Sequence, residues 1–550
     1  MVRAALPAPD PDNGGIYLPQ GFRATVVADE LTVGKKVGKS QDTLRFAAAA
    51  PNGDLYVKLK HGGILALRDA DGDGRFEIKE EFAASPGSGG TGIMFHGPYL
   101  YYSTRTSVHR IKYTPGELVP KAVPETIVSD LPAGKDHDAK SFAFDDQGRM
   151  IVEVGSYFNV LSDGDRRLGA KGKTDAEVAE FQRSWGGFWR FDPDKLNQKQ
   201  SDGFHFSTGH RHAMGLVWHP VSKTFFMIQM GRDNLNTIDP EHYDELDNAE
   251  RVSEAMFVLH EGANFGWPYA YWDPIKKAHM LAPEYGGDNH KKAAAGKYDE
   301  PVVAFPAHWA PIQMCLYSGT QFPEHYRNGM FVAFHGSWNR APRSQAGYKI
   351  AFVPFDSRGQ PKGDYEAFAD GFPGVEEFVN TKEAKYRPAG VTMGPDGSLY
   401  VTDTERGRIW RIFYTGESTP GLARTVPTPK TETASTQTVK VDEKSKGAQV
   451  YAQICAACHM PDGNGVPSMQ PSLVTSAVVK GNVDTLIRTV LEGPAAVLPA
   501  DREKFQVVMP PMSVLDDESL AGVISYIRAR FAQDPKPVTP AQIKALRKAP

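Results

Sequence analysis

The stretch AGVTMGPDGSLYVTD, residues 389–403, joins two short apolar runs through a turn. Val, Thr, Leu and Tyr favour strands, whereas Pro395, Asp396 and Gly397 favour reversal of the chain. The alternation of such runs with a tight turn predicts a β-hairpin.

Similar units recur upstream at 45–59, 91–104, 140–154, 214–229 and 315–334. Several are followed by a third β-rich run, as in HGGILALRD, TSVHRIKY and GRIWRIFY. Each unit can bury its faces only against its neighbours, so the repeat predicts a six-bladed β-propeller; a β-sandwich array is the alternative. Long insertions follow the third and fourth units, where we expect them to build the functional face.

A different signal lies near the end of the chain, in QICAACHMPDGNG, residues 453–465. Cys455 and Cys458 have the spacing that attaches haem c through two thioether bonds, and His459 follows as the proximal iron ligand. A zinc site would need two more ligands at matching spacing, and a redox dithiol would need a βαβ context.

The residues after this motif resemble class I cytochromes c over 446–533. Leu520, Val523, Ile524, Ile527 and Phe531 form the apolar stripe of a helix, and acidic residues crowd its start. By this resemblance Met509, rather than Met512, is the distal iron ligand.

The predicted architecture is therefore an all-β six-bladed propeller (1–415), a flexible Ser/Thr/Pro-rich linker (416–445), a small all-α cytochrome c domain (446–533) and a C-terminal tail (534–550). The 62 basic and 66 acidic residues give a net charge of −4, which argues against nucleic acid as a partner. No apolar run reaches membrane-spanning length. Covalent haem attachment leads us to expect a periplasmic protein whose signal peptide has been removed.

An electron carrier needs an electron source. Three cysteines are too few for iron–sulfur clusters, and no Gly-x-Gly-x-x-Gly occurs in a βαβ setting. A dissociable organic redox cofactor is therefore expected in the propeller.

The propeller sequence itself resembles the pyrroloquinoline quinone (PQQ)-dependent sugar dehydrogenases, most closely the sorbosone and pyranose dehydrogenase branch. The resemblance is carried by LPAGKDHDAKSFAFDDQG (131–148), STGHRHAMGLVWHP (207–220), NFGWPYAYW (264–272), FPEHYRNGMFVAFHGSWNR (322–340) and YRPAGVTMGPDGSLYV (386–401). It implies a six-bladed propeller that binds PQQ and Ca²⁺ on one face and oxidises a sugar or a sugar-derived aldehyde.

The resemblance also implies roles for individual residues. His137 matches the general base, Asp136 a carboxylate of the site, and Arg211 the residue that polarises the quinone. PQQ carries three carboxylates, so we expect arginine clamps and flanking polar or aromatic residues around it. The candidates are Arg45, His212, His308, His335, Trp338, Asn339, Arg340 and Arg387.

Three features depart from the glucose-oxidising branch: His212 replaces Asn, Asn339 replaces Lys, and Ser156 stands where an Asp orients the base. The substrate is therefore not assigned by analogy with glucose. The Ca²⁺ ligands in this family are main-chain carbonyls, which here correspond to Gly231 and Arg232. The same motifs leave two alternatives: a Ca²⁺-dependent lactonase or hydrolase, and a carbohydrate-binding propeller that carries a cytochrome.

A separate acidic stretch, DADGDGRFEIKE (69–80), has the spacing of a twelve-residue Ca²⁺ loop. Its ligands would be Asp69, Asp71, Asp73 and Glu80. A strand precedes it, so an acidic turn between strands is the competing interpretation.

The complete prediction is a haem-containing quinoprotein. Sugar or aldehyde would be oxidised with PQQ, and electrons would pass to haem c and on to a soluble carrier or a respiratory oxidase.

Overall fold

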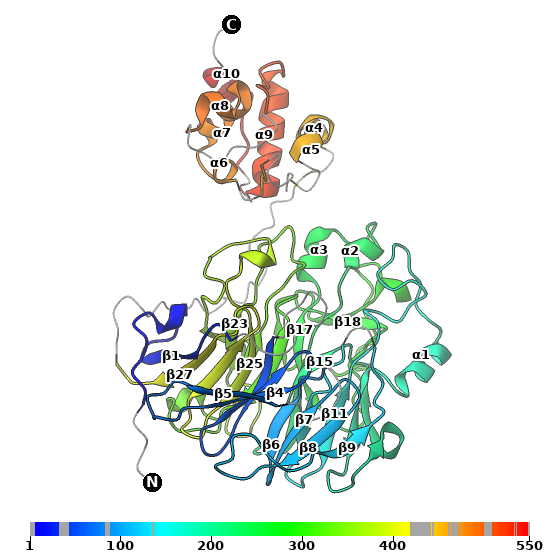
Figure 1. Cartoon of the computed structure of the whole chain (residues 1–550). Coiled ribbons are helices and arrows are strands. Elements are labelled where there is room, and N and C mark those ends of the chain that lie inside the picture. Colours follow the sequence, from blue (N-terminus) through cyan, green and yellow to red (C-terminus); the bar gives the residue numbers. More distant parts are fainter. Residues whose placement is uncertain are drawn as a thin grey trace. The chain divides into compact units, whose positions relative to one another are not determined.

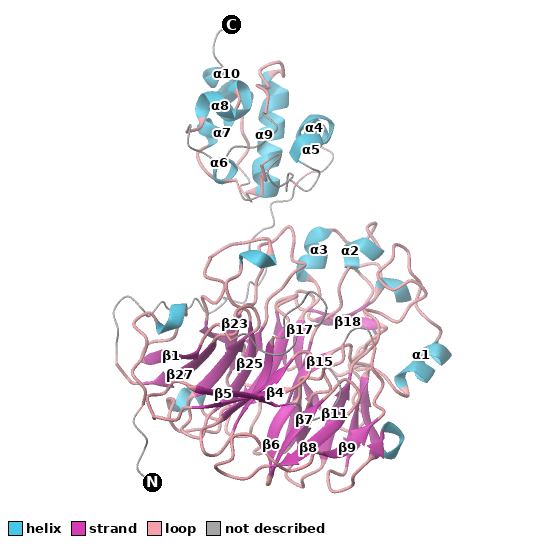
Figure 2. Cartoon of the chain, viewed as in Figure 1, coloured by secondary structure: helices cyan, strands magenta, loops and turns pink. Residues whose placement is uncertain are grey.

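The computed structural model describes residues 6–31, 43–82, 89–134, 137–417, 442, 445–459, 463, 471–474, 476–499, 509–532, 534 and 536–547. The chain forms two compact units, Met1–Lys430 and Thr431–Pro550. Strands make up most of the regular structure of the first unit, and helices that of the second (Figures 1 and 2).

The first unit is a six-bladed propeller, which confirms the fold predicted from the repeats. Each of the six predicted hairpins forms the two inner strands of one blade, and each blade has four main strands. The first three blades are β2 (Leu44–Ala49), β3 (Leu55–Leu59), β4 (Ile64–Arg68) and β5 (Ile78–Phe82); β6 (Ile93–His96), β7 (Tyr99–Ser103), β8 (Val108–Lys112) and β9 (Glu125–Ser129); and β10 (Phe142–Phe144), β11 (Met150–Val154), β12 (Gly187–Phe191) and β14 (Phe204–Thr208).

The remaining three blades are β15 (Ala213–His219), β16 (Thr224–Gln229), β17 (Glu254–Leu259) and β20 (Val303–Phe305); β21 (Pro311–Leu316), β22 (Met330–Phe334), β23 (Lys349–Val353) and β24 (Glu366–Ala369); and β25 (Pro388–Met393), β26 (Leu399–Asp403), β27 (Ile409–Tyr414) and β1 (Phe22–Ala28). Strand β13 (Gln198–Lys199) adds to β9, and β18 (Ala270–Asp273) pairs with β19 (Ala278–Leu281).

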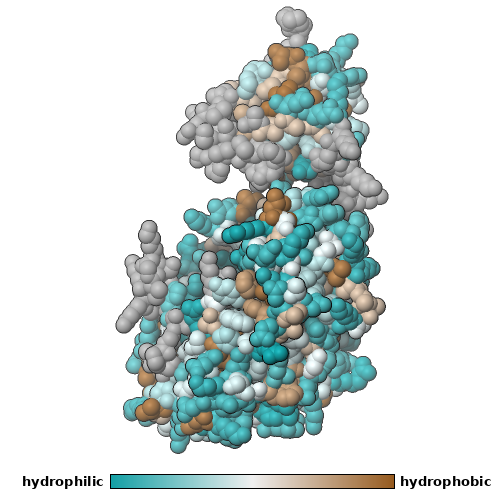
Figure 3. All heavy atoms as spheres, turned by 90° about the vertical axis from the view of Figure 1, so that its right-hand side faces the viewer, coloured by the Kyte–Doolittle hydropathy of each residue, from teal (hydrophilic) through white to brown (hydrophobic). Residues whose placement is uncertain are grey.

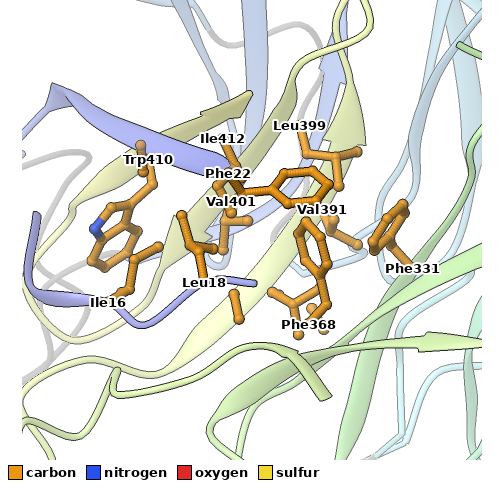
Figure 4. Packing of buried hydrophobic residues seen from close by; sticks show 14 of the residues in the cluster. Ile16, Leu18, Phe22, Phe331, Phe368, Val391, Leu399, Val401, Trp410 and Ile412 are labelled. Carbon is orange, nitrogen blue, oxygen red and sulfur yellow. The ribbon is translucent and has the colours of Figure 1, made fainter. Parts of the chain in front are cut away.

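The sixth blade closes the ring with a strand from the start of the chain. Strand β1 pairs antiparallel with β27, with Phe22 opposite Tyr414. Its Phe22 packs edge-on against Phe322 and Phe368 at centroid distances of 4.8 and 5.0 Å. Figure 4 shows Phe22 and Phe368 meeting in the apolar cluster between the last two blades. Strand β1 is the outermost strand of this blade, so it pairs the edge of β27 and joins the two ends of the propeller in one sheet.

Helices of the propeller lie in its insertions. Helix α1 (Asp175–Gln182) follows β11, whereas α2 (Leu235–Ile238) and α3 (Glu245–Glu250) follow β16 (Figure 1). These are the two places where long insertions were predicted. Figure 3 shows mainly hydrophilic side chains on the face in view, with scattered apolar ones.

The second unit is helical. Its elements are α4 (Lys446–Val450), a π turn (Tyr451–Cys455), α5 (Ala456–His459), α6 (Ala477–Lys480), α7 (Val483–Glu492), α8 (Pro494–Val497), α9 (Asp517–Phe531) and α10 (Pro540–Leu546). The predicted apolar stripe of α9 is buried. Helices α4 and α9 cross at Gly447 and Gly522, where a Cβ on Gly447 would lie 2.1 Å from the Gly522 carbonyl oxygen.

The chain continues in ordered structure beyond residue 533, where the sequence led us to expect a tail. Helix α10 buries Ile543 in the apolar core of the second unit. Arg547, just after it, donates a 2.8 Å hydrogen bond to Asp517 at the start of α9. Among the described residues, no helix is long and apolar enough to cross a membrane.

Candidate functional site

The predicted propeller residues gather at one end of the blades because of the blade topology. In an antiparallel blade, the start of the first strand and the end of the second lie at the same end. His137, Arg211, His308 and Arg387 precede the inner strands β10, β15, β21 and β25. Ser156, Asp233, His335 and Asn339 follow the second strands β11, β16 and β22, so the topology places both sets on the same face.

His137 is held as a neutral base. Its Nδ1 atom lies 2.8 Å from the carbonyl oxygen of Ser156. A carbonyl oxygen only accepts, so Nδ1 carries the proton and Nε2 is left with a lone pair. Burial, and then the charges of Arg211 and His212, hold the pKa of His137 well below its usual value. Asp136, the predicted companion carboxylate, lies outside the described residues.

Arg211 is nearly buried and pairs with a carboxylate that the sequence analysis did not single out. Its Nη2 atom donates a 2.8 Å hydrogen bond to Asp233, which also accepts from Asn339 Nδ2 at 2.6 Å. Burial raises the pKa of Asp233, but Arg211, His308 and Asn339 together outweigh burial and hold the pKa below its usual value. The only sequence feature that pointed to Asp233 was its place directly after Arg232, in the segment QMGRDNLN predicted to bind Ca²⁺.

Asn159, from the insertion after β11, fixes the position of Asp233. Its side-chain amide donates to the Asp233 carbonyl oxygen at 2.9 Å and accepts from the Asp233 amide at 2.8 Å. His308 lies on the other side, with Nδ1 3.5 Å from the Asp233 carboxylate and Nε2 2.7 Å from the Asn248 carbonyl oxygen. These contacts join the third, fourth and fifth blades around one anion.

A second cationic group surrounds His335. Arg387 donates to the carbonyl oxygens of His335 and Gly336 at 3.1 and 2.9 Å. Burial, and then the charges of Arg387, Arg45 and Lys60, hold the pKa of His335 well below its usual value. The structure therefore brings the predicted Arg45, Arg387 and His335 together, and adds Lys60.

Other predicted residues have varied surroundings. Arg340 donates to the Ala307 carbonyl oxygen at 2.7 Å, and the Trp338 side chain is 61% exposed. His212 stacks on His137 with a centroid distance of 4.7 Å. The charge of Arg166, which the sequence analysis did not consider, acts on both His137 and Arg211.

The segment predicted to bind Ca²⁺ is tied to buried acids. The Gly231 amide donates to Glu254 at 2.9 Å, and Arg232 forms two hydrogen bonds with Glu284 at 2.6 and 3.0 Å. Burial raises the pKa of Glu254 to about 8. The Arg232 guanidinium is thus committed to Glu284, which leaves its main-chain carbonyl for the predicted role.

The acidic loop differs from its prediction at one position. Glu77, not Glu80, joins Asp69, Asp71 and Asp73, and one oxygen of each lies within 4.8 Å of the others. Glu77 accepts a hydrogen bond from the Ala70 amide at 2.8 Å, which folds it back over the turn. Glu80 lies within β5, opposite Ala66. No ion is required by this geometry, since the loop carboxylates already accept from loop amides.

In the helical unit, a main-chain carbonyl orients the ring of His459, the predicted iron ligand. Its Nδ1 atom lies 2.9 Å from the Pro471 carbonyl oxygen, so Nε2 is again the unprotonated nitrogen. Cys455 and Cys458 are partly buried and free, and burial raises the pKa of Cys455 to about 11. Met509 and Met512 both pack against the apolar core.

Known proteins resemble both the propeller and the helical unit of this chain. A family model described as TrAA12-like matches residues 18–415, and one described as cytochrome c oxidase, cbb3-type, subunit III, matches 442–527. A PQQ-dependent pyranose dehydrogenase of Coprinopsis cinerea is 25% identical over 228 residues, which are 36% of this chain and 28% of that protein. Cytochrome c-552 of Thermus thermophilus is 33% identical over 113 residues, 19% of this chain and 86% of that one.

The structural comparison agrees with the fold. The holo form of the pyranose dehydrogenase PQQ domain from Coprinopsis cinerea covers 74% of this chain and 98% of its own, with a TM-score of 0.54 and 19% identity. The chain spans about half or less of the length of the first curated relatives that its propeller matches. The predicted resemblance of the two parts, a quinoprotein-type propeller and a cytochrome c, is confirmed.

Proposed function

Because this chain belongs to the TrAA12-like family, we propose that it oxidises a sugar or a sugar-derived aldehyde with PQQ and passes the electrons to haem c. The observation that carries the proposal is the pairing of a neutral base, His137, with a buried cation, Arg211, at one end of the propeller. A hydride-transfer site needs both, since one group takes a proton while negative charge develops on the acceptor.

The residues present fit PQQ. Arg211 Nε and Asn339 Oδ1 are buried and have no hydrogen-bond partner among the described residues. Buried polar atoms in proteins are normally partnered, so these two are matched to an external polar molecule. Arg45, Lys60 and Arg387 supply positive charge for carboxylates, and planar guanidinium groups can hold carboxylates by two parallel hydrogen bonds.

Bound PQQ would supply the hydride acceptor. His137 Nε2 would take the proton of the substrate hydroxyl, and the Ser156 carbonyl would stabilise the resulting imidazolium through Nδ1–H. Arg211 would face the oxygen on which charge develops. Asp233, which also accepts from Asn339, holds the Arg211 guanidinium in place. We assign Ca²⁺ to the carbonyl oxygens of Gly231 and Arg232, as the family resemblance implies.

Tyr157 makes a ring-shaped substrate the better fit. It directly follows Ser156, and its side chain is 41% exposed. Its ring packs against Gly134, where a Cβ would lie 2.2 Å from Tyr157 Cδ2, and approaches Trp185 at 5.9 Å. An exposed aromatic face beside the base can cover the apolar face of a sugar ring.

The cytochrome provides the electron exit. We propose that Cys455 and Cys458 attach the haem, with His459 and Met509 as its axial ligands. Met/His ligation raises the haem potential, which favours electron uptake. A soluble carrier or a respiratory oxidase would then receive the electrons. The haem-attachment motif supports a periplasmic location for the protein.

The test is the visible spectrum of the haem-loaded protein after addition of PQQ, Ca²⁺ and a panel of aldoses, ketoaldehydes and lactones. We expect the reduced haem band to rise only when PQQ and an oxidisable substrate are both present. Reduction of an added dye with an unchanged haem band would disprove the internal electron route. Lactone hydrolysis without any reduction would support the hydrolase alternative instead.

A further inference from the structure

A fully buried carboxylate, that of Glu153, lies close to His137, the proposed base. Glu153 is in β11 and its side chain is 0% exposed. Its Oε2 atom accepts from the Lys140 amide at 3.2 Å, and its Oε1 atom from the Ala213 amide at 3.4 Å. A buried charge is costly unless other charges or hydrogen bonds compensate it, so its neighbours matter.

Two histidines from the segment before β15 flank this carboxylate. His210 Nε2 lies 3.5 Å and His212 Nδ1 3.6 Å from Glu153 Oε1. These distances exceed those of strong hydrogen bonds, so each histidine makes only a long polar contact with the carboxylate. Burial raises the pKa of Glu153, but the two histidines outweigh it and lower the pKa to about 2. Glu153 is therefore an anion across the neutral pH range.

Only one of these histidines also contacts the base. The rings of His212 and His137 stack with a centroid distance of 4.7 Å and an interplanar angle of 25°. His210 instead packs against Phe188, at 4.6 Å. Gly155 lies between Glu153 and the base: a Cβ there would be 2.8 Å from Glu153 Oε1 and 2.6 Å from the His137 carbonyl oxygen. The Glu153 carboxylate, the His212 ring and the His137 ring thus pack against one another in that order.

We propose that Glu153 is a positioning residue that holds His212 in the stack that fixes the ring plane of His137. The inference rests on the proposed role of His137 as the base. The Ser156 carbonyl holds one edge of the His137 ring, and the stack restrains rotation about that bond. Together they direct Nε2 to one position, which efficient proton transfer requires.

The charged groups around this set come from three elements. Arg211 and His212 face His137 from the segment before β15, and Arg166 faces it from the insertion after β11. Lys140, which is fully buried and lies 3.8 Å from Asp138, contributes positive charge to Glu153. Replacing Glu153 by glutamine keeps the shape of the side chain but removes its negative charge from among these positive groups.

The experiment compares Glu153→Gln, His212→Asn, the double variant and His210→Asn. The first readout is the ¹⁵N-NMR signature of the His137 ring in protein without PQQ, assigned by its loss in His137→Asn. We expect Glu153→Gln and His212→Asn to change these signals alike, and His210→Asn to leave them in place. An unchanged His137 ring in Glu153→Gln would overturn the proposal.

The second readout is the rate of the PQQ-loaded enzyme. We expect Glu153→Gln to lower kcat about tenfold to a hundredfold with little change in KM, as for small misplacements of a catalytic group. The double variant should lose no more than His212→Asn alone, because Glu153 acts through His212. Additive losses would show an independent role. If Glu153→Gln does not fold, His212→Asn and Glu153→Asp are compared instead. Glu153→Asp keeps the negative charge and should keep the His137 signals, whereas His212→Asn should change them.

The two proposals fail in different ways. The NMR comparison does not depend on catalysis, so it still decides the role of Glu153 if no sugar is oxidised. Sugar oxidation with an undisturbed His137 ring in Glu153→Gln would retain the function and reject the positioning role.

Discussion

His137 Nδ1 donates a hydrogen bond to the main-chain carbonyl oxygen of Ser156, at 2.8 Å. If His137 is the base, as proposed, this main-chain carbonyl would orient it in place of the aspartate that the family resemblance led us to expect. The Ser156 hydroxyl donates to the Phe158 carbonyl oxygen at 2.6 Å, and its Oγ atom lies 3.5 Å from His137 Nδ1, at the limit of a hydrogen bond. The orientation of the base therefore depends on the loop conformation rather than on the residue type at position 156.

This arrangement predicts different outcomes for two neighbouring substitutions. His137→Asn removes the base and should lower kcat/KM by a factor of about 10²–10⁴. Ser156→Ala keeps the carbonyl oxygen and should change kcat/KM by less than about threefold, since it loses the hydrogen bond to Phe158 and only a long 3.5 Å contact with His137 Nδ1. Steady-state kinetics with PQQ-loaded protein provides the measurement. A large loss in Ser156→Ala would show that the hydroxyl, not the carbonyl, orients the base.

The pH dependence should follow from the depressed pKa of His137. Burial and the nearby charges of Arg211 and His212 disfavour its protonated form, so the base is already neutral at pH 6.5 and above. We expect kcat/KM to fall from protonation of His137 only as the pH drops below 6.5. An acid limb centred above pH 6.5 that disappears in His137→Asn would contradict this assignment of its pKa.

The Asp233 carboxylate should matter for stability as well as for cofactor binding. Asp233→Asn leaves Arg211 without its anionic partner inside the protein, and loss of one member of a buried pair costs about 3–5 kcal/mol. Urea unfolding of the PQQ-free protein should show this loss. Asn339→Ala, which removes only a neutral donor to the same carboxylate, should cost about 1–3 kcal/mol. Equal losses in the two variants would mean that the charge of Asp233 is not the important property.

The parts of this structure that were predictable from the sequence are those set by local pattern. The hairpin at 389–403 and the stripe of α9 each follow from periodicity within one element. Arg211 and Asp233 flank the two strands of the β15–β16 hairpin, but no local pattern marks their side chains as partners. Glu153 and His212 belong to neighbouring blades, so only the packing of one blade against the next brings them together. The acidic cluster contains Glu77 instead of the predicted Glu80, which sequence spacing could not show either. Which glutamate joins the cluster depends on how tightly the turn after Asp69 folds.

Closure of the ring by β1 should make Phe22 important for the whole propeller. Its ring is 4% exposed and touches Phe322, Phe368 and Tyr414. Phe22→Ala should lower the free energy of unfolding by about 3–5 kcal/mol. Replacement of Val123, which is 84% exposed, by Ala is the matched control and should change it by less than about 0.5 kcal/mol. Thermal unfolding monitored by near-UV circular dichroism measures both, and an unchanged midpoint in Phe22→Ala would show that β1 is not needed for closure.

The two methionines before α9 allow a direct test of the haem ligand. Both pack on the core of the second unit, but the Met512 amide is held by a 2.8 Å hydrogen bond to the Val490 carbonyl oxygen. We expect Met509→Leu to remove the sulfur ligand, which should change the ferric haem spectrum and lower the reduction potential, because methionine ligation raises it. Met512→Leu preserves volume and should leave both properties close to those of the wild type. Redox titration of the two variants decides the assignment, and a drop in potential confined to Met512→Leu would make Met512 the ligand in place of Met509.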